Sequence, residues 1–332
     1  RFEDVAPLAQ RLAVELSVDP RVFGEMGQMF WRFDFTGEGL LEEEEALKLC
    51  LYMLRRYRDA ALPPAARDVH LCGGIKQQSV GDQYAVEAKV GEGGQGAIFM
   101  GRHWQSGHEV VIKMYDKSRP NAPLEDIAQE FQLLKSLRHP RIAHVFDIFQ
   151  DRSNVYVVQE PYFGGDLSSA IRRAHEAGAR VDERWLARVM QQVLAGVAFL
   201  HGRRIMHCDL KETNVMVTGA ADWTNPQVVV IDFGLANEFA TRSRPGGTPG
   251  YMPPEVWECG LWTPKGDVFS LGVMLLSLRT GQQPFVQGCR SLEEVRHRTR
   301  EEKPEMAMGS DALRRLAGRM LEKRLQDRPP VA

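Results

Sequence analysis

The sequence predicts an α+β protein in which an all-α module precedes a domain of two lobes. Apolar residues recur at helical spacing near the start of the chain. From Tyr84 the pattern changes to short strands with Gly-bearing turns, and beyond Gly165 it is mostly helical. The expected boundaries are 1–58 for the helical module, 59–82 for a linker, 83–159 for a small antiparallel β lobe, 160–165 for a hinge and 166–332 for a large helical lobe.

The individual elements are expected where these patterns run. In the module, three apolar stripes predict helices at Phe2–Leu16, Val22–Phe33 and Ala46–Leu54. The expected strands are Tyr84–Val90, Ala97–Trp104, Glu109–Tyr115, Ile142–Phe149 and Val155–Gln159. The remaining expected helices are Leu124–Leu137, Leu167–Ala177, Asp182–His201, Asp267–Thr280, Leu292–Arg300 and Asp311–Lys323.

Composition excludes several classes of protein. Of 332 residues, 43% are hydrophobic and 26% charged, which is unlike a disordered chain. The net charge is −2 from 42 basic and 44 acidic residues, so nothing indicates a nucleic-acid partner. The five cysteines are odd in number and scattered, which favours a reducing compartment and predicts a cytoplasmic location. Because the first residue is Arg1, the sequence leaves membrane association through an upstream anchor open.

A glycine-rich segment lies between the first two expected strands. Gly91, Gly93 and Gly96 stand at the spacing G-x-G-x-x-G, with Ile98 two residues on. This spacing alone also fits an ordinary tight hairpin. Because it joins strand to strand, it disfavours a dinucleotide fold and favours a hairpin whose backbone N–H groups cover phosphates.

Lys113 ends the next expected strand, and Glu130 lies on the helix that follows. A lysine at a strand end often only extends to solvent. A Lys113–Glu130 ion pair would instead hold the ammonium toward the α- and β-phosphates of a nucleotide.

The most informative segment runs from His207 to Asn214, and Asp232 follows in Asp232-Phe233-Gly234. Phosphoryl transfer needs a carboxylate that orients the attacking hydroxyl and accepts its proton, and Asp209 fits this role. It also needs oxygen ligands for Mg²⁺, and Asn214 and Asp232 fit that role. Surface turn residues are the alternative, but they do not explain this spacing together with the glycine segment and Lys113.

Taken together, residues 84–332 resemble a eukaryotic protein kinase domain, of the serine/threonine class because of Lys211 and Thr248. The segment Trp262–Phe285 is most similar to the calmodulin-kinase and calcium-dependent group. The resemblance implies ATP and Mg²⁺ as cofactors and protein Ser/Thr residues as substrates. It extends to Gly247–Tyr251, Pro253–Glu255, Asp267–Gly272 and Asp327–Pro329.

The resemblance also implies roles for individual residues. Catalysis would use Lys113, Glu130 and Lys211, the last of which would contact the γ-phosphate. Thr248 would form a hydrogen bond to Asp209. Adenosine would be held by backbone groups of Glu160 and Tyr162, by the side chain of Asp166, and between Ile98, Val111 and Met216, with Gln159 as gatekeeper. Glu255 would pair with Arg328, Asp267 would hold the catalytic loop, and Leu134, Val145, His207 and Phe233 would stack as a spine.

Some positions depart from the family pattern. Cys208 stands where the family has an Arg that pairs with a phosphorylated activation loop, and a thiol cannot form that pair. Val111 is bulkier than the usual Ala, and Gln159 is a polar gatekeeper. Glu212-Thr213 replaces the usual Pro-Glu, which puts a preference for basic substrates in doubt.

The N-terminal module contains a segment that resembles an EF-hand calcium loop, Asp34 to Glu45. Oxygen-bearing side chains stand at loop positions 1, 3, 5, 9 and 12, and a glycine, Gly39, stands at the sharp turn. The alternative is an acidic helix N-terminus favoured by the helix dipole. The implied calcium ligands are Asp34, Thr36, Glu38, the backbone carbonyl of Leu40, and Glu45.

These observations predict a protein serine/threonine kinase regulated by calcium through its N-terminal module. One alternative is a kinase for small molecules, which the segment Gly247–Glu255 disfavours. Another is a catalytically weak or dead scaffold with a calcium-sensing or purely structural module, which the filled positions of the reactive groups disfavour.

Overall fold

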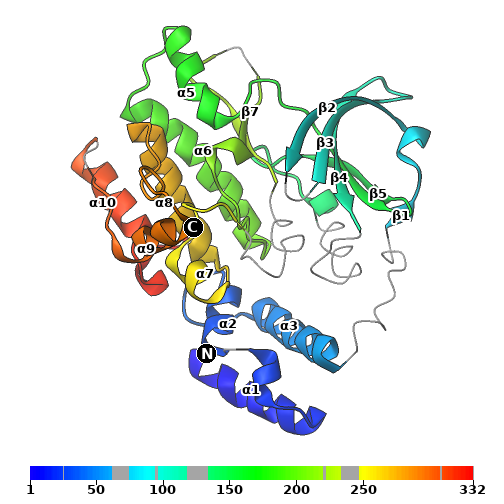
Figure 1. Cartoon of the computed structure of the whole chain (residues 1–332), viewed down its shortest axis with the longest axis vertical. Helices are drawn as coiled ribbons and strands as arrows, with labels where there is room; N and C mark the ends of the chain where they lie inside the picture. The colour runs from blue at the N-terminus through cyan, green and yellow to red at the C-terminus, as the bar shows by residue number, and fades with distance from the viewer. Residues whose placement is uncertain are drawn as a thin grey trace.

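The fold was analysed in a computed structural model, which describes residues 1–24, 26–61, 75–93, 96–117, 134–219, 222–232, 247–306 and 309–331. Figure 1 shows three parts: a helical module at the N-terminal end, a β lobe, and a large helical lobe between them. The bilobal arrangement expected from the sequence is therefore present.

The module consists of α1 (Phe2–Leu16), a 3₁₀ turn η1 (Pro20–Phe23), α2 (Met26–Phe33) and α3 (Glu43–Ala61). Its core contains Val5, Ala9, Ala13, Phe23, Met29, Phe30, Phe33, Leu49 and Met53. The expected stripe on α3 is wrong, because Leu47, Leu51 and Leu54 are exposed. Apolar residues occur on more than one side of this helix, and the position of α2 and η1 decides which side is buried.

The small lobe is a six-stranded sheet in the order β1-β5-β6-β4-β3-β2. Its strands are β1 (Lys76–Gln77), β2 (Tyr84–Gly93), β3 (Gly96–His103), β4 (Glu109–Asp116), β5 (Val145–Gln150) and β6 (Asn154–Gln159), and η3 (Val80–Asp82) precedes β2. β1 pairs in parallel with β5, so residues 75–82 of the expected linker belong to this lobe. A two-residue strand carries no periodic signal, which is why the sequence did not reveal it.

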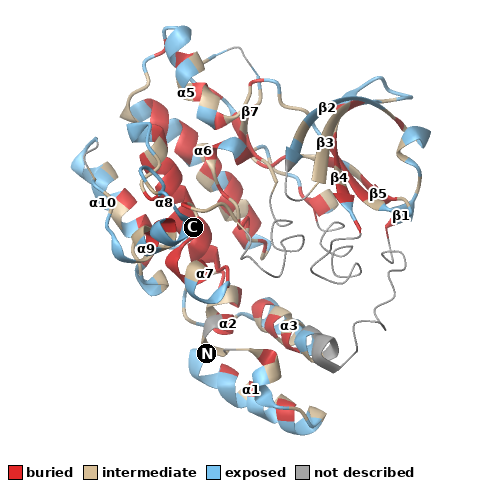
Figure 2. Ribbon diagram, viewed as in Figure 1, coloured by how far each residue is buried: buried red, intermediate tan, exposed pale blue. Residues whose placement is uncertain are grey.

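The large lobe contains mostly helices. They are α5 (Leu167–Glu176), α6 (Glu183–Gly202), α7 (Pro254–Cys259), α8 (Pro264–Thr280), α9 (Leu292–Glu301) and α10 (Asp311–Met320), with 3₁₀ turns η4 (Glu212–Asn214) and η5 (Leu325–Asp327) and a hairpin of β7 (Val215–Val217) and β8 (Val228–Val230). α8 is buried along nearly its whole length, whereas α10 buries one side (Figure 2). The short α7 and the hairpin were not expected from the sequence.

A buried ion pair joins two ends of this lobe. Arg328 donates from Nη1 and Nη2 to the two carboxylate oxygens of Glu255, at 2.7 and 2.8 Å. The expected Glu255–Arg328 contact is thus present, and it fixes the start of α7 against η5.

Of the expected helix Leu124–Leu137, only the end from Leu134 lies within the described residues. Among the described residues, no helix is both long and apolar enough to cross a membrane.

Candidate active site

The hinge connects the lobes and is fixed to the β7–β8 hairpin. The N–H of Gly164 donates to the carbonyl of Val217 at 3.1 Å, and the N–H of Val217 donates to Gly165 at 2.8 Å. Asp166 pairs with Met216 in an isolated bridge, so two residues expected around the nucleoside lie together. Asp166 also begins α5, where its Oδ1 accepts the N–H of Ser169 at 2.9 Å.

Asp209 lies at the centre of a hydrogen-bond network. The hydroxyl of Thr248 donates to its Oδ1 at 2.6 Å, and Lys211 Nζ donates to its Oδ2 at 2.8 Å. Lys211 also donates to the Thr248 hydroxyl at 2.7 Å. Asn214 Nδ2 donates to the backbone carbonyl of Asp209 at 2.7 Å, which leaves the amide oxygen of Asn214 available to a cation. The sequence expected these four residues in one site, and the fold brings them together.

The catalytic loop is fixed from below by the wholly buried Asp267 at the start of α8. Its Oδ2 accepts the N–H of His207 at 2.8 Å, and its Oδ1 accepts the N–H of Cys208 at 2.9 Å. Cys208 has a positive φ of 65° and packs in an apolar cluster with Met252, Val256 and Trp262. A buried thiol thus occupies the position where the family has an arginine.

The glycine segment forms a hairpin of β2 and β3, in which Gly93 stands opposite Gly96 and Gly91 opposite Ile98. A Cβ on Gly96 would lie 1.9 Å from the carbonyl oxygen of Met114, so no other residue fits there. Residues 94–95 at the tip lie outside the described residues.

Lys113 lies on β4 and forms an ion pair with Asp232, whose φ is 61°. Burial lowers the pKa of Lys113 from 10.5 to about 7. The expected partner Glu130 lies outside the described residues, as does Phe233. The structure therefore pairs Lys113 with the expected magnesium ligand.

The nucleoside side of the cleft begins at the gatekeeper. Gln159 is buried and stands opposite Val111 in the register of β4 and β6. The N–H of Glu160 donates to the carbonyl of His144 at 3.0 Å, and the hydroxyl of Tyr162 donates to the Glu160 carboxylate at 3.1 Å. Burial and the Glu160 charge raise the pKa of the Tyr162 phenol.

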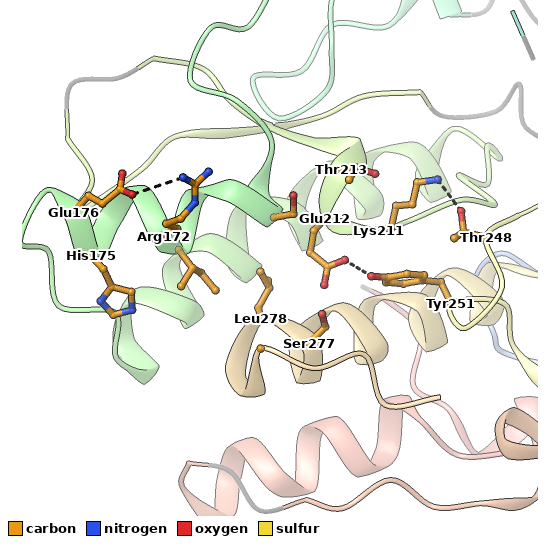
Figure 3. A pocket seen from close by; sticks show the side chains of 13 residues that line it. Arg172, His175, Glu176, Lys211, Glu212, Thr213, Thr248, Tyr251, Ser277 and Leu278 are labelled. Carbon is orange, nitrogen blue, oxygen red and sulfur yellow. Dashed lines mark hydrogen bonds and ion pairs between the residues drawn. The ribbon is translucent and has the colours of Figure 1, made fainter. Parts of the chain in front are cut away.

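Beyond the catalytic loop lies an open cavity of about 870 Å³. Lys211, Glu212, Thr248 and Tyr251 line one side, and Ile171 and Arg172 of α5 line another (Figure 3). The Tyr251 hydroxyl donates to Glu212 Oε2 at 2.5 Å. This hydrogen bond joins the catalytic loop to the segment that follows Thr248. The sequence singled out Glu212 only as a departure from the family pattern and did not indicate its contact with Tyr251.

Residues 84–332 match the protein kinase domain family. The chain belongs to this family. It is similar to two proteins of Arabidopsis thaliana, CBL-interacting serine/threonine-protein kinase 13 and CBL-interacting serine/threonine-protein kinase 18, and is 32% identical to each over 213 and 212 residues. The alignments cover 61% of this chain and 40% and 39% of those proteins, so the chain spans about two fifths of their length.

As a protein kinase domain, the chain presents the expected reactive groups apart from Glu130, which is not described. The family match begins at residue 84, so it does not account for the helical module.

In the module, α2 and α3 are joined by the segment that contains the expected calcium ligands. Asp34 and Glu45 are buried at the two ends of the loop. Asp34 Oδ1 accepts the N–H of Gly37 at 2.9 Å, and Asp34 Oδ2 accepts the N–H of Gly39 at 3.1 Å. The hydroxyl of Thr36 lies 3.3 Å from Asp34 Oδ1, whereas Glu38 and Leu40 are exposed.

Proposed function

We propose that this chain is a serine/threonine protein kinase that transfers the γ-phosphoryl group of ATP to protein hydroxyls with Mg²⁺. The observation that carries the proposal is the placement of Asp209 between Thr248, Lys211 and Asn214, beside an open cavity. A carboxylate fixed on two sides and open to a cavity can orient a substrate hydroxyl and accept its proton.

The other groups divide the remaining tasks. Lys211 can contact the γ-phosphate while it stays bonded to Thr248, and Lys113 can hold the α- and β-phosphates. Asn214 and Asp232 would hold Mg²⁺, which neutralises phosphate charge. They fit this role because Asn214 donates through Nδ2 and keeps its amide oxygen for a cation, and Asp232 places a carboxylate beside Lys113 in the cleft. Gly91, Gly93 and Gly96 would cover the phosphates. The nucleoside would contact Ile98, Val111, Glu160, Tyr162, Asp166 and Met216.

The open cavity favours a protein substrate over a small molecule. Its lining runs from the catalytic loop to α5 and to Ser277 and Leu278 of α8, which is room for several residues of an extended peptide. The filled reactive positions also disfavour a dead scaffold.

The proposal is tested by phosphate transfer from labelled ATP to matched peptides with Ser, Thr or Tyr as the acceptor. We expect transfer to Ser and Thr, dependence on Mg²⁺, and loss of about 10²–10⁴-fold in kcat in Asp209→Asn. Wild-type activity in Asp209→Asn, or transfer to a small hydroxylated metabolite in preference to any peptide, would contradict it.

We also propose that calcium regulates this kinase through the loop Asp34–Glu45, as in kinases of the calcium-dependent group. Two buried carboxylates at loop positions 1 and 12, with Thr36 beside the first, fit calcium in kind. In the described residues, no three His, Cys, Asp or Glu side chains gather at one point. Because affinity rises with the charge of the ligands, we expect weak binding, with Kd of about 10⁻⁴ M or above.

Calorimetric titration of the whole chain with calcium tests this second proposal. Glu45→Gln should abolish the heat, whereas Glu44→Gln, one residue away and exposed, should retain it. No heat from wild-type protein at millimolar calcium would leave the module with a structural role only.

We propose a cytoplasmic location, which the cysteines support. No disulfide joins those of the described residues, as suits a reducing compartment.

A further inference from the structure

The helical module packs directly against the large lobe, close to the end of α6 (Figure 1). Arg32 of α2 donates to the backbone carbonyl of Trp262 at 3.4 Å. The ring of Phe35 meets the ring of His201 edge to face, with centroids 6.1 Å apart. The second contact joins a residue of the loop Asp34–Glu45 to the end of α6, which leads into the catalytic loop.

Arg204 of the large lobe is held by the module through both its backbone and its side chain. Its carbonyl accepts from Lys48 Nζ of α3 at 2.9 Å. Its guanidinium pairs with Glu42 and lies 3.5 Å from Glu45 Oε1. Arg204 has a φ of 60°, a conformation that residues with a Cβ rarely adopt and that persists where the surroundings impose it.

Glu45 is the buried end of this contact. It is fully buried, and its two oxygens accept the N–H groups of Phe35 at 3.0 Å and Glu42 at 2.9 Å. A buried carboxylate needs a cation nearby, and Arg204 supplies one from the other part of the chain. The same carboxylate thus shapes the loop and fixes Arg204.

The segment that contains Arg204 is also connected to the catalytic loop. His201 Nε2 is bonded to Asp267 Oδ2 at 2.8 Å, and Asp267 accepts the N–H groups of His207 and Cys208. Only Ile205 and Met206 separate Arg204 from His207. The module therefore touches the turn 201–207 at its first residue, His201, and at its middle, Arg204, and this turn leads into the catalytic loop.

We propose that the loop Asp34–Glu45 positions the catalytic loop of this kinase, with Arg204 as the positioning residue. The inference rests on the kinase activity proposed above and does not require calcium. Arg204 contacts neither the nucleotide cleft nor the cavity beside Asp209, so its effect passes through the 201–207 turn and Asp267.

The test compares Arg204→Gln, Glu45→Gln and the double variant, as full chains, in buffer with a calcium chelator. Arg203→Gln is the control, because Arg203 is adjacent and exposed and stacks over the ring of Phe199 in α6. We expect kcat to fall by about fivefold or more in each single variant, with KM for ATP and peptide within about twofold of wild type. The double variant should be no worse than the poorer single variant, because both changes break one contact.

Hydrogen exchange provides the second measurement. In Arg204→Gln, amides 205–211 should exchange faster, while those of α10 stay unchanged. Arg204→Lys, which keeps the charge, should retain most of the activity, and Lys48→Met replaces Arg204→Gln if the latter does not fold. Unchanged kcat in Arg204→Gln, additive losses in the double variant, or equal effects in Arg203→Gln would overturn the proposal. Absence of transfer by the wild-type chain would instead refute the kinase activity itself.

Discussion

Lys113 and Asp232 form an ion pair inside the cleft, between β4 of the small lobe and the segment that follows β8. Two groups expected to bind phosphates and Mg²⁺ therefore lie beside each other with opposite charges. ATP with Mg²⁺ offers each a better partner, because the phosphates take the ammonium and the cation takes the carboxylate.

This relationship predicts a nucleotide affinity that depends on both charges. Asp232→Asn leaves Lys113 buried without its carboxylate, so it should lower stability in the free chain and abolish Mg²⁺-dependent ATP binding. The thermal shift on adding MgATP should disappear in Asp232→Asn, and Asp222→Asn, an exposed acid of the same lobe, should show the wild-type shift. A normal shift in Asp232→Asn would contradict the assignment of Asp232.

A second prediction concerns Thr248, which donates to Asp209 and accepts from Lys211. Thr248→Ala removes the hydroxyl from both bonds, so Asp209 should lose its fixed orientation, with a loss of about tenfold or more in kcat. Thr248→Ser retains the hydroxyl and should keep most of the activity. Single-turnover rates at saturating ATP distinguish the two variants. Equal rates for Thr248→Ala and Thr248→Ser would show that the hydroxyl does not position Asp209.

Several features of the site could be read from the sequence because the chemistry requires particular residue types at fixed spacings. Asp209, Lys211, Asn214 and Thr248 were expected together, and the last three each lie within hydrogen-bond distance of Asp209. The strands of the small lobe were also expected. In β4 buried residues alternate with intermediate or exposed ones, except at the adjacent buried pair Ile112 and Lys113.

Other features depend on long-range packing and left no local signal. The burial of Leu49 and Met53 in place of Leu47 and Leu51 is decided by where α2 lies, which the α3 sequence does not encode. The contact between Glu45 and Arg204 joins residues far apart in the chain, and neither the loop nor the turn identifies its partner.

A third prediction follows from His207, which is buried beneath the catalytic loop. Its Nε2 lies 2.9 Å from the carbonyl of Ile231, and its Nδ1 accepts the N–H of Asp209 at 3.2 Å. The neutral ring donates from Nε2 and accepts at Nδ1. Protonation of the ring would therefore remove the acceptor for the Asp209 N–H. Burial lowers the pKa of His207 below its ordinary 6.5, although Asp267 and Asp209 act in the opposite direction.

The sign of the pH effect follows from proton binding. Below pH 6.5, the unfolded state binds a proton at this residue before the folded state does, so the free energy of unfolding should decrease as pH falls from about 7. Above that range the contribution is complete. Urea unfolding at pH 7.5 and 5.5 measures the difference, and His207→Gln, which does not titrate, should show a smaller decrease than wild type. An equal decrease in both proteins would place the pH dependence elsewhere.

The last prediction concerns the cavity wall formed by Glu212 and Tyr251. Glu212 is only 4% exposed, its Oε2 accepts from the Tyr251 hydroxyl, and its Oε1 has no hydrogen-bond partner in the described residues. The contact joins the catalytic loop to the segment that follows Thr248. Burial and the Glu212 charge raise the pKa of the Tyr251 phenol, so it remains a donor at any ordinary pH.

Removal of the donor leaves a buried carboxylate with neither oxygen bonded. Tyr251→Phe should therefore lower the free energy of unfolding by about 1–3 kcal/mol. It should also raise KM for the peptide severalfold while KM for ATP stays unchanged, because the displaced wall lines the peptide cavity and not the nucleotide cleft. Glu212→Gln keeps an acceptor for the phenol and removes the charge, so it should be milder on both measurements. If KM for ATP rises in Tyr251→Phe and KM for the peptide does not, the cavity beside Asp209 is not where the protein substrate binds.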